Sequence, residues 1–160
     1  MNYWLMKSEP DTFSIEHLKQ RRNQTEHWDG VRNYQVRNML RDDFNVGDQA
    51  LFYHSSCPVP AAVGIVTITR AGYPDHTAFD PNSPYFDAKS SAENPRWFMV
   101  DVQYTQTFPK PVTLKAMKAN PELLASDFAL LRKGSRLSIM PVTATQWSII
   151  LSMANAQHKQ

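Results

Sequence analysis

Residues 97–108 place the strongest constraint on the fold of this chain, because apolar and polar side chains alternate through them. This period of two predicts a β-strand with one face in the core and the other in water. Residues 49–55 and 62–70 are rich in residue types that favour strands, and residues 3–7 and 136–140 predict two more. So many strands argue against a helical bundle. We predict an α+β fold, a small mixed sheet or barrel decorated with short helices.

Capping signals mark the helices that we expect around these strands. The predicted helices begin at Ser14, Asn33, Thr113, Asp127 and Thr143. The Asp127 helix should end at Gly134, and the last helix should run toward Asn155. Residues 71–96 show no sustained period. Their length and aromatic content favour a functional loop over disorder.

Length and composition bound the class of protein. With 160 residues and 42% hydrophobic content, we expect one domain over residues 1–155, followed by a frayed tail over 156–160. Cys57 is the single cysteine, so no internal disulfide can form, and we expect neither a metal nor another cofactor. The N-terminus reaches a charge too soon for a signal peptide, and no apolar run is long enough to cross a bilayer. These features favour a soluble, cytoplasmic protein.

Residues 30–37, read together with residues 3–10, carry the functional signal. They interleave aromatic rings, guanidinium groups and amides around the start of a predicted helix, which suits an unstacked base and its phosphates. The net charge of +2 is too small for affinity that rests mainly on counterion release. We therefore expect a local, shaped contact with DNA or RNA, with no membrane partner and a monomeric chain.

Seven motifs, in order along nearly the whole chain, resemble those of the EVE domain family in the PUA-like superfamily, which also holds the YTH domains. They are residues 3–10, 30–35, 52–55, 73–75, 79–81, 94–97 and 131–138. The resemblance implies a PUA-like β-barrel with flanking helices. It also implies a pocket for a modified base, commonly a modified cytosine, in DNA or RNA. One departure is Ala61-Ala62, where the family pattern leads us to expect a glycine shortly before Val63.

A pocket that reads one base needs rings on its faces and polar groups at the base edge. The candidate walls are Trp28, Tyr34, Tyr53 and Tyr85, and the candidate edge groups are Lys7, Ser8, Glu9, Asn33, His54, Ser55 and Asp80. The alternatives are structural: Glu9 could simply pair with Lys7, and Asp80 before Pro81 could only form a turn. Trp4 and Trp97 lie within strands, where a place in the core is the better interpretation.

Basic side chains near the predicted helix at Asn33 are candidates for phosphate contacts. The candidates are Arg32, Arg37, Arg41, Lys133 and Arg136. A solvated helix face explains the three arginines at positions 32, 37 and 41 equally well. A surface turn at Gly134 explains Lys133 and Arg136 equally well. For the base itself, one buried methyl group contributes about 0.8 kcal/mol, or roughly a fourfold preference. We therefore predict modest selectivity for the modification.

Two other classes of function compete with the hypothesis that this protein binds one modified base in a pocket. Some small PUA-like relatives are amidohydrolases that act on acylated nucleosides, and Ser8 with Lys7 and Glu9 would be the catalytic set. Adjacent strand residues point to opposite faces, which makes that set awkward. The third class is a protein-interaction module that uses residues 71–96. The hypothesis of a base-binding pocket requires a concave, ring-lined cavity where the start of the chain, the Asn33 region and the long irregular segment meet.

Overall fold

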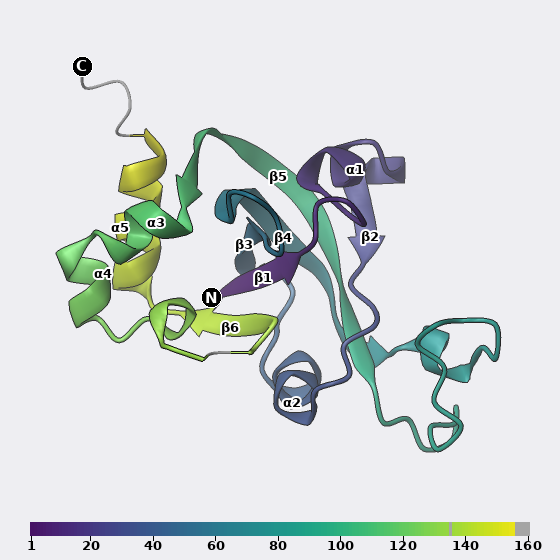
Figure 1. The fold of residues 1–160 in the computed structure, drawn as a ribbon. Helices are drawn as coiled ribbons and strands as arrows, with labels where there is room; N and C mark the ends of the chain where they lie inside the picture. Colours follow the sequence, from purple (N-terminus) through teal and green to yellow (C-terminus); the bar gives the residue numbers. More distant parts are fainter. Residues whose placement is uncertain (135, 156–160) are drawn as a thin grey trace.

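The computed structural model describes residues 1–134 and 136–155. Its centre is a six-stranded sheet in the order β2-β5-β4-β3-β1-β6 (Figure 1). The strands are β1 (Tyr3–Ser8), β2 (Thr25–His27), β3 (Gln49–His54), β4 (Ala61–Pro74), β5 (Phe98–Thr113) and β6 (Ile139–Val142). β1 runs parallel to β3, and the other neighbours are antiparallel. The sheet is therefore mixed, as the sequence predicts.

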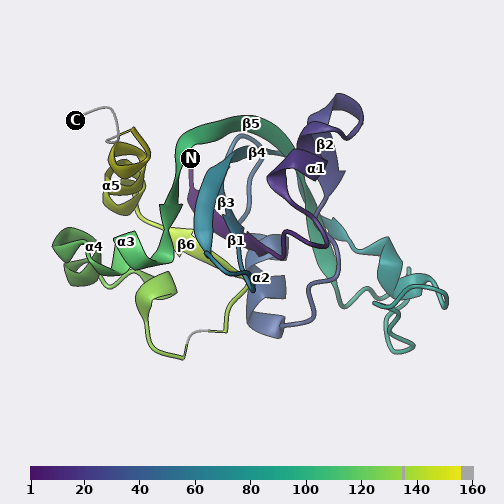
Figure 2. The same cartoon turned by 45° about the horizontal axis from the view of Figure 1, so that its top comes forward.

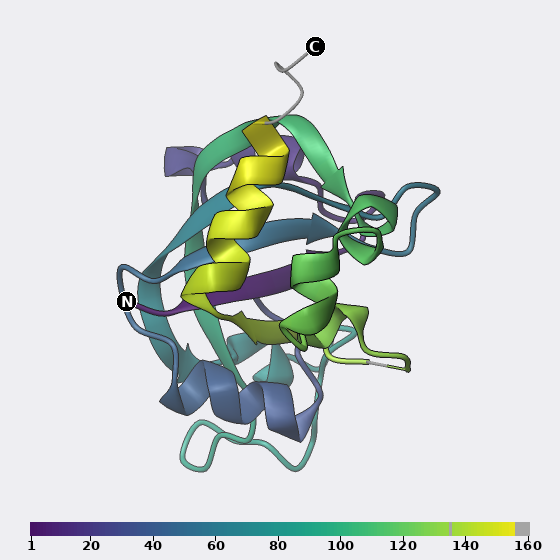
Figure 3. The same ribbon diagram turned by 90° about the vertical axis from the view of Figure 1, so that its left-hand side faces the viewer.

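Short helices surround the sheet. The α-helices are α1 (Ile15–Lys19), α2 (Tyr34–Asp42), α3 (Leu114–Lys118), α4 (Pro121–Ala125) and α5 (Ala144–Asn155), and the 3-10 helices are η1 (Arg22–Gln24), η2 (His76–Phe79) and η3 (Ala129–Leu131). Figure 3 shows α5 lying across one face of the sheet, with α3 and α4 beside it. No helix within the described residues is long and apolar enough to cross a membrane.

Two hydrophobic clusters form the core, one on each face of the sheet. β1 contributes to both because its side chains alternate between faces. Trp4 and Met6 pack with α1 and α2 on one face, whereas Leu5 packs with α3, α4 and α5 on the other. Trp4 and Trp97 are both buried, as predicted.

The long strands β4 and β5 bend strongly over the rest of the sheet (Figure 2). Their register shifts at several points, and such bulges increase local bend and twist. The ladders between described residues leave β2 and β6 as the two edges of the sheet. A mixed sheet surrounded by short helices is thus confirmed, but the closed barrel is not.

Several predicted elements are found and others need correction. Side-chain caps begin helices at Ser14, Asn33 and Thr113, and Thr143 forms the predicted capping box with Gln146.

The helix predicted from Asp127 to Gly134 is wrong. Asp127 has a φ of +56°, a left-handed conformation that interrupts a helix, and only the 3-10 turn η3 follows. Instead Asn120 caps α4, because its side chain accepts from two backbone N–H groups. The predicted strand 136–140 begins later, as β6. The predicted tail over 156–160 lies outside the described residues.

Candidate functional site

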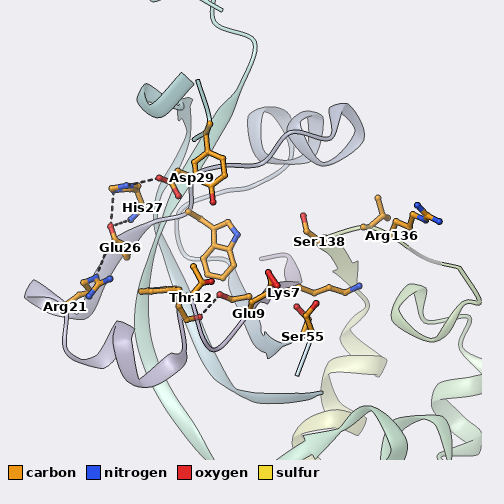
Figure 4. Close-up of a pocket in the computed structure, with 16 residues that line it drawn as sticks. Lys7, Glu9, Thr12, Arg21, Glu26, His27, Asp29, Ser55, Arg136 and Ser138 are labelled. Carbon is orange, nitrogen blue, oxygen red and sulfur yellow. Dashed lines mark hydrogen bonds and ion pairs between the residues drawn. The ribbon is translucent and has the colours of Figure 1, made fainter. Parts of the chain in front are cut away.

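A cavity of about 600 Å³ opens at the end of β1 (Figure 4). Segments that are far apart in the sequence meet in its walls. These are residues 7–9 with 12–13, residues 26–29 with Arg21, residues 55–56 after β3, Tyr85, and residues 136–138 before β6. A volume of this size is in the range typical of small-molecule sites, about 300–1,000 Å³.

A tight turn shapes the floor of the cavity where β1 ends. The backbone carbonyl of Glu9 accepts hydrogen bonds from the N–H groups of Thr12 (3.0 Å) and Phe13 (2.8 Å). The Ser8 hydroxyl donates to the carbonyl of Phe13 at 2.5 Å. The Ser55 N–H donates to the Ser8 carbonyl at 2.9 Å, which extends the β1–β3 ladder into the site. The backbone here is therefore held on both sides.

Trp28 supplies the aromatic wall. Its ring meets Phe52 edge-on, with centroids 5.6 Å apart, and meets Phe13 edge-on at 6.4 Å. Its backbone N–H donates to the Val100 carbonyl at 2.7 Å, next to β2. Because the indole is braced by two rings and by a hydrogen-bonded backbone, it forms a rigid wall.

A chain of charged groups lines one side of the cavity. The Arg21 guanidinium contacts the Glu26 carboxylate at 2.8 Å, and the other oxygen of Glu26 lies 3.0 Å from His27 Nδ1. His27 Nε2 lies 3.4 Å from the Asp29 carboxylate. Burial raises the pKa of Asp29, the positive potential of His27 lowers it in part, and Asp75 and Glu26 raise it further. A carboxyl group with a raised pKa in a cavity marks a candidate site.

Tyr85 reaches the cavity from the long irregular segment and is held there by Arg32. One arm of the Arg32 guanidinium donates to the Tyr85 carbonyl at 2.5 Å, and the other contacts the buried Asp75 carboxylate at 3.1 Å. Burial alone would raise the pKa of Asp75, but hydrogen bonds from Thr77, Gly30 and Arg32 hold it below its usual range. Arg32 therefore fastens two loops together.

Lys7 enters the cavity at the opposite side from Asp29 (Figure 4). Burial lowers the pKa of its ammonium group. Within the described residues, the ammonium has no hydrogen bond or ion pair, and none joins it to Glu9.

The structure brings seven of the predicted site residues into this cavity. They are Lys7, Ser8, Glu9, Trp28, Ser55, Tyr85 and Arg136. The start of the chain and the long segment thus meet in a ring-lined hollow, whereas the Asn33 region, which we also expected there, lies outside its lining.

The other predicted base contacts lie elsewhere. Asn33 caps α2 by accepting from the Val36 N–H, and Tyr34 stacks on Trp97 with centroids 4.8 Å apart. Tyr53 is 2% exposed within the core. His54 Nε2 accepts from the N–H at the start of α1, and the Asp80 carboxylate closes a turn by accepting from the Asn82 N–H.

The predicted phosphate contacts from the α2 region also have protein partners. Arg37 donates to the Arg96 carbonyl at 2.7 Å, and Arg41 pairs with Asp42 at 2.8 Å. Arg32 and Arg37 thus connect the α2 region to the segment that follows β4, whereas Arg41 contacts only its neighbour within α2. Lys133 is exposed and lies outside the cavity lining, whereas Arg136 lies in it.

Sequence reasoning missed about half of the lining. The missed residues are Thr12, Phe13, Arg21, Glu26, His27, Asp29, Ser56, Leu137 and Ser138. The signal that pointed to some of them is the run of titratable residues on both sides of Trp28, directly before the Gly30 motif. β2 was not predicted, so nothing indicated that this run lies beside β5.

Comparison with known proteins identifies the family. The EVE domain matches residues 2–153 of this chain. Thymocyte nuclear protein 1 from Gallus gallus is 43% identical over 94% of this chain and 68% of its own length. The human protein is 40% identical over 95% of this chain and 73% of its own length. Because these relatives are named as nuclear proteins, the predicted cytoplasmic location stays a prediction.

Solved structures agree in fold. A Pseudomonas putida protein is 51% identical, with a TM-score of 0.87 over 95% of this chain and 99% of its own. Human THYN1, crystallised in complex with DNA containing 5-methylcytosine, is 39% identical, with a TM-score of 0.90 over 96% of this chain and 98% of that one. This chain therefore belongs to the EVE domain family.

Proposed function

We propose that this protein binds DNA that carries 5-methylcytosine and takes the modified base into the cavity at the end of β1. The observation that carries the proposal is the likeness to human THYN1 in complex with such DNA, which extends over nearly the whole chain. The cavity supports it independently, because its size and its braced Trp28 wall suit one flipped base.

Trp28 and Tyr85 are the two rings that we assign to stacking on the flipped base. Extracting a base from a duplex costs a few kcal/mol, and stacking on one aromatic side chain contributes about 1–3 kcal/mol. Trp28 and Tyr85 both line the cavity. Two rings together with edge hydrogen bonds can exceed the cost, whereas one ring alone would barely match it.

Asp29 is the group that we assign to the amine edge of the base. Its carboxylate is half-buried in the cavity wall, and the exocyclic amine of cytosine needs an acceptor. The neighbouring His27, held between Glu26 and Asp29, orients that carboxylate. The acceptors that we predicted from sequence were Glu9 and Asp80, and Asp80 lies outside the cavity.

Binding measurements test the proposal. We expect fluorescence anisotropy to give tighter binding of a duplex with 5-methylcytosine than of the same duplex with cytosine, by roughly fourfold for the methyl group alone. Replacing Tyr85 by alanine should weaken binding of the methylated duplex about tenfold. The matched control is Phe86→Ala, because Phe86 is the next residue and is similarly exposed (44% against 39%) but lies outside the lining. Equal affinities for the two duplexes would contradict the proposal that the protein distinguishes 5-methylcytosine from cytosine.

The hydrolase alternative finds less support. The Ser8 hydroxyl already donates to the Phe13 carbonyl, and Lys7 leaves β1 on the opposite face from Ser8. A nucleophile needs a base within hydrogen-bond reach, and the described residues around Ser8 provide no such pairing. We infer binding without turnover. Incubation with N4-acetylcytidine should therefore release no acetate.

The interaction-module alternative rests on residues 71–96. Much of this segment is fastened to the domain, since Arg32 and Arg37 both donate to its carbonyls and Asp87 accepts from the Trp97 indole at 2.7 Å. Its contribution to the cavity through Tyr85 favours a role as part of the base site.

A further inference from the structure

β1 ends inside the cavity and divides it into two sides. Successive side chains of a strand point to opposite faces, so Lys7 follows Leu5 toward the face that α3, α4 and α5 cover, whereas Ser8 follows Met6 toward the face of Trp28. Figure 4 shows this separation: Arg21, Glu26, His27 and Asp29 gather on one side, and Lys7, Ser55, Arg136 and Ser138 on the other.

The two sides differ in charge. On the Trp28 side, each cation has a carboxylate partner, because Arg21 contacts Glu26 and His27 lies between Glu26 and Asp29. On the other side, the Lys7 ammonium is partly desolvated and has no partner within the described residues. Among the described residues, the positive charge of the cavity that no carboxylate neutralises therefore lies on the Lys7 side.

Two serines of the cavity lining lie beside the end of β1, because Ser55 follows β3 and Ser138 precedes β6. Backbone hydrogen bonds fix both positions: the Lys7 backbone N–H donates to the Ser138 carbonyl at 2.8 Å, and the Ser55 backbone N–H donates to the Ser8 carbonyl at 2.9 Å. Arg136 completes the same wall. An ammonium, two serine side chains and a guanidinium that line the same side of one cavity (Figure 4) are donors suited to a phosphate.

We propose that the Lys7 side of the cavity is a phosphate subsite, built from Lys7, Ser55, Ser138 and Arg136, that binds the backbone phosphate next to the flipped base. This inference rests on the proposed function and adds an orientation to it. The base stacks on Trp28 with its amine edge toward Asp29, and the neighbouring phosphate lies on the Lys7 side of the end of β1.

Glu9 is exposed at the end of β1 and lies between the two sides of the cavity (Figure 4). The change from acidic to basic lining therefore falls between Glu9 and Lys7. Arg32 and Arg37 of the α2 region already have protein partners, because Arg32 contacts the buried Asp75 carboxylate and Arg37 donates to the Arg96 carbonyl.

The test compares ligands on the unmodified protein. Isothermal titration with 5-methyl-2′-deoxycytidine and with its 5′- and 3′-monophosphates should show about tenfold tighter binding for one of the monophosphates, as expected for a hydrogen bond between charged groups. Equal affinity of the nucleoside and both monophosphates overturns the subsite while leaving the proposed function intact. Failure of all three ligands to bind contradicts the proposed function, and the inference with it.

A variant then assigns the effect to Lys7. Lys7→Met, which keeps the length of the side chain, should abolish the advantage of the monophosphate over the nucleoside and reduce the salt slope of DNA binding by about one. Lys110→Met, at an exposed position on β5, is the control and should match the unmodified protein. Equal weakening of nucleoside and monophosphate by Lys7→Met would overturn the assignment.

Discussion

Gly30 and Tyr85 are in direct contact, and the Tyr85 ring occupies the space that a side chain at residue 30 would need. A Cβ atom on Gly30 would lie 2.6 Å from Cζ of that ring. Gly30 also has a φ of +79°, and its N–H donates to the Asp75 carboxylate at 2.9 Å. One glycine thus allows an aromatic side chain of a distant loop to reach the cavity.

We expect Gly30→Ala to destabilise the fold and to weaken DNA binding. The positive φ alone costs an alanine about 1–2 kcal/mol, and displacement of the Tyr85 ring adds about 1–3 kcal/mol. Urea unfolding gives the total. Gly47→Ala is the control, because Gly47 also has a positive φ (+95°) but no atom within 4 Å of its Cβ position. Equal losses at the two positions would show that the contact with Tyr85 contributes nothing.

Arg32→Met should be strongly destabilising. It leaves the fully buried carboxylate of Asp75 without its cation, and breaking a buried pair in this way costs about 3 kcal/mol. Arg41→Met removes the exposed pair with Asp42 and should cause no measurable change in the unfolding free energy. If both variants unfold at the same urea concentration, Arg32 does not stabilise the fold in the way that its contacts with Asp75 and the Tyr85 carbonyl predict.

Every described strand except β2, and most helix starts, could be predicted because their signals are local. Alternation marks β5, and the caps at Asn33 and Thr143 depend on side chains within three residues. The failures have equally local causes. The cap at Asn120 was overlooked next to Pro121, and Asp127 adopts a left-handed conformation that its residue type permits but does not announce.

The candidate site was harder to predict because its chemistry depends on long-range partners. Arg32 looked like a phosphate contact by sequence, and only the fold brings it to Asp75 and to the Tyr85 carbonyl. Tyr53 was predicted as a wall of the base pocket, but its side chain is buried in the core. Asp29 had no motif of its own, yet the β2–β5 pairing places it beside the cavity.

Asp29→Asn should stabilise the fold and weaken base binding together. The folded protein raises the pKa of Asp29, chiefly by burial, with His27 opposing the shift and Asp75 and Glu26 adding to it. A raised carboxyl pKa means that the ionised form destabilises the folded state at neutral pH. The variant should therefore gain unfolding free energy at pH 7, and this gain should vanish as the pH falls below the ordinary value of 3.8.

Urea unfolding at pH 7 and at pH 3.5, with anisotropy of the methylated duplex at pH 7, measures both effects. Asp42→Asn is the control, since Arg41 lowers the pKa of Asp42 and no gain is expected there. A stability gain without any loss of affinity would remove Asp29 from the base edge, because a group kept at a cost to stability should contribute to function.

Asn33 separates a structural from a functional interpretation of the Gly30 motif. Its side chain accepts from the Val36 N–H at 3.0 Å, so Asn33→Ala should lose about 1 kcal/mol of unfolding free energy. Asn33→Ser and Asn33→Asp keep a capping oxygen and should restore most of it. If Asn33 only caps α2, these two variants should also bind the methylated duplex normally in anisotropy titrations. If instead they fold normally and bind weakly, Asn33 contacts the DNA, and the interface extends from the cavity along the start of α2.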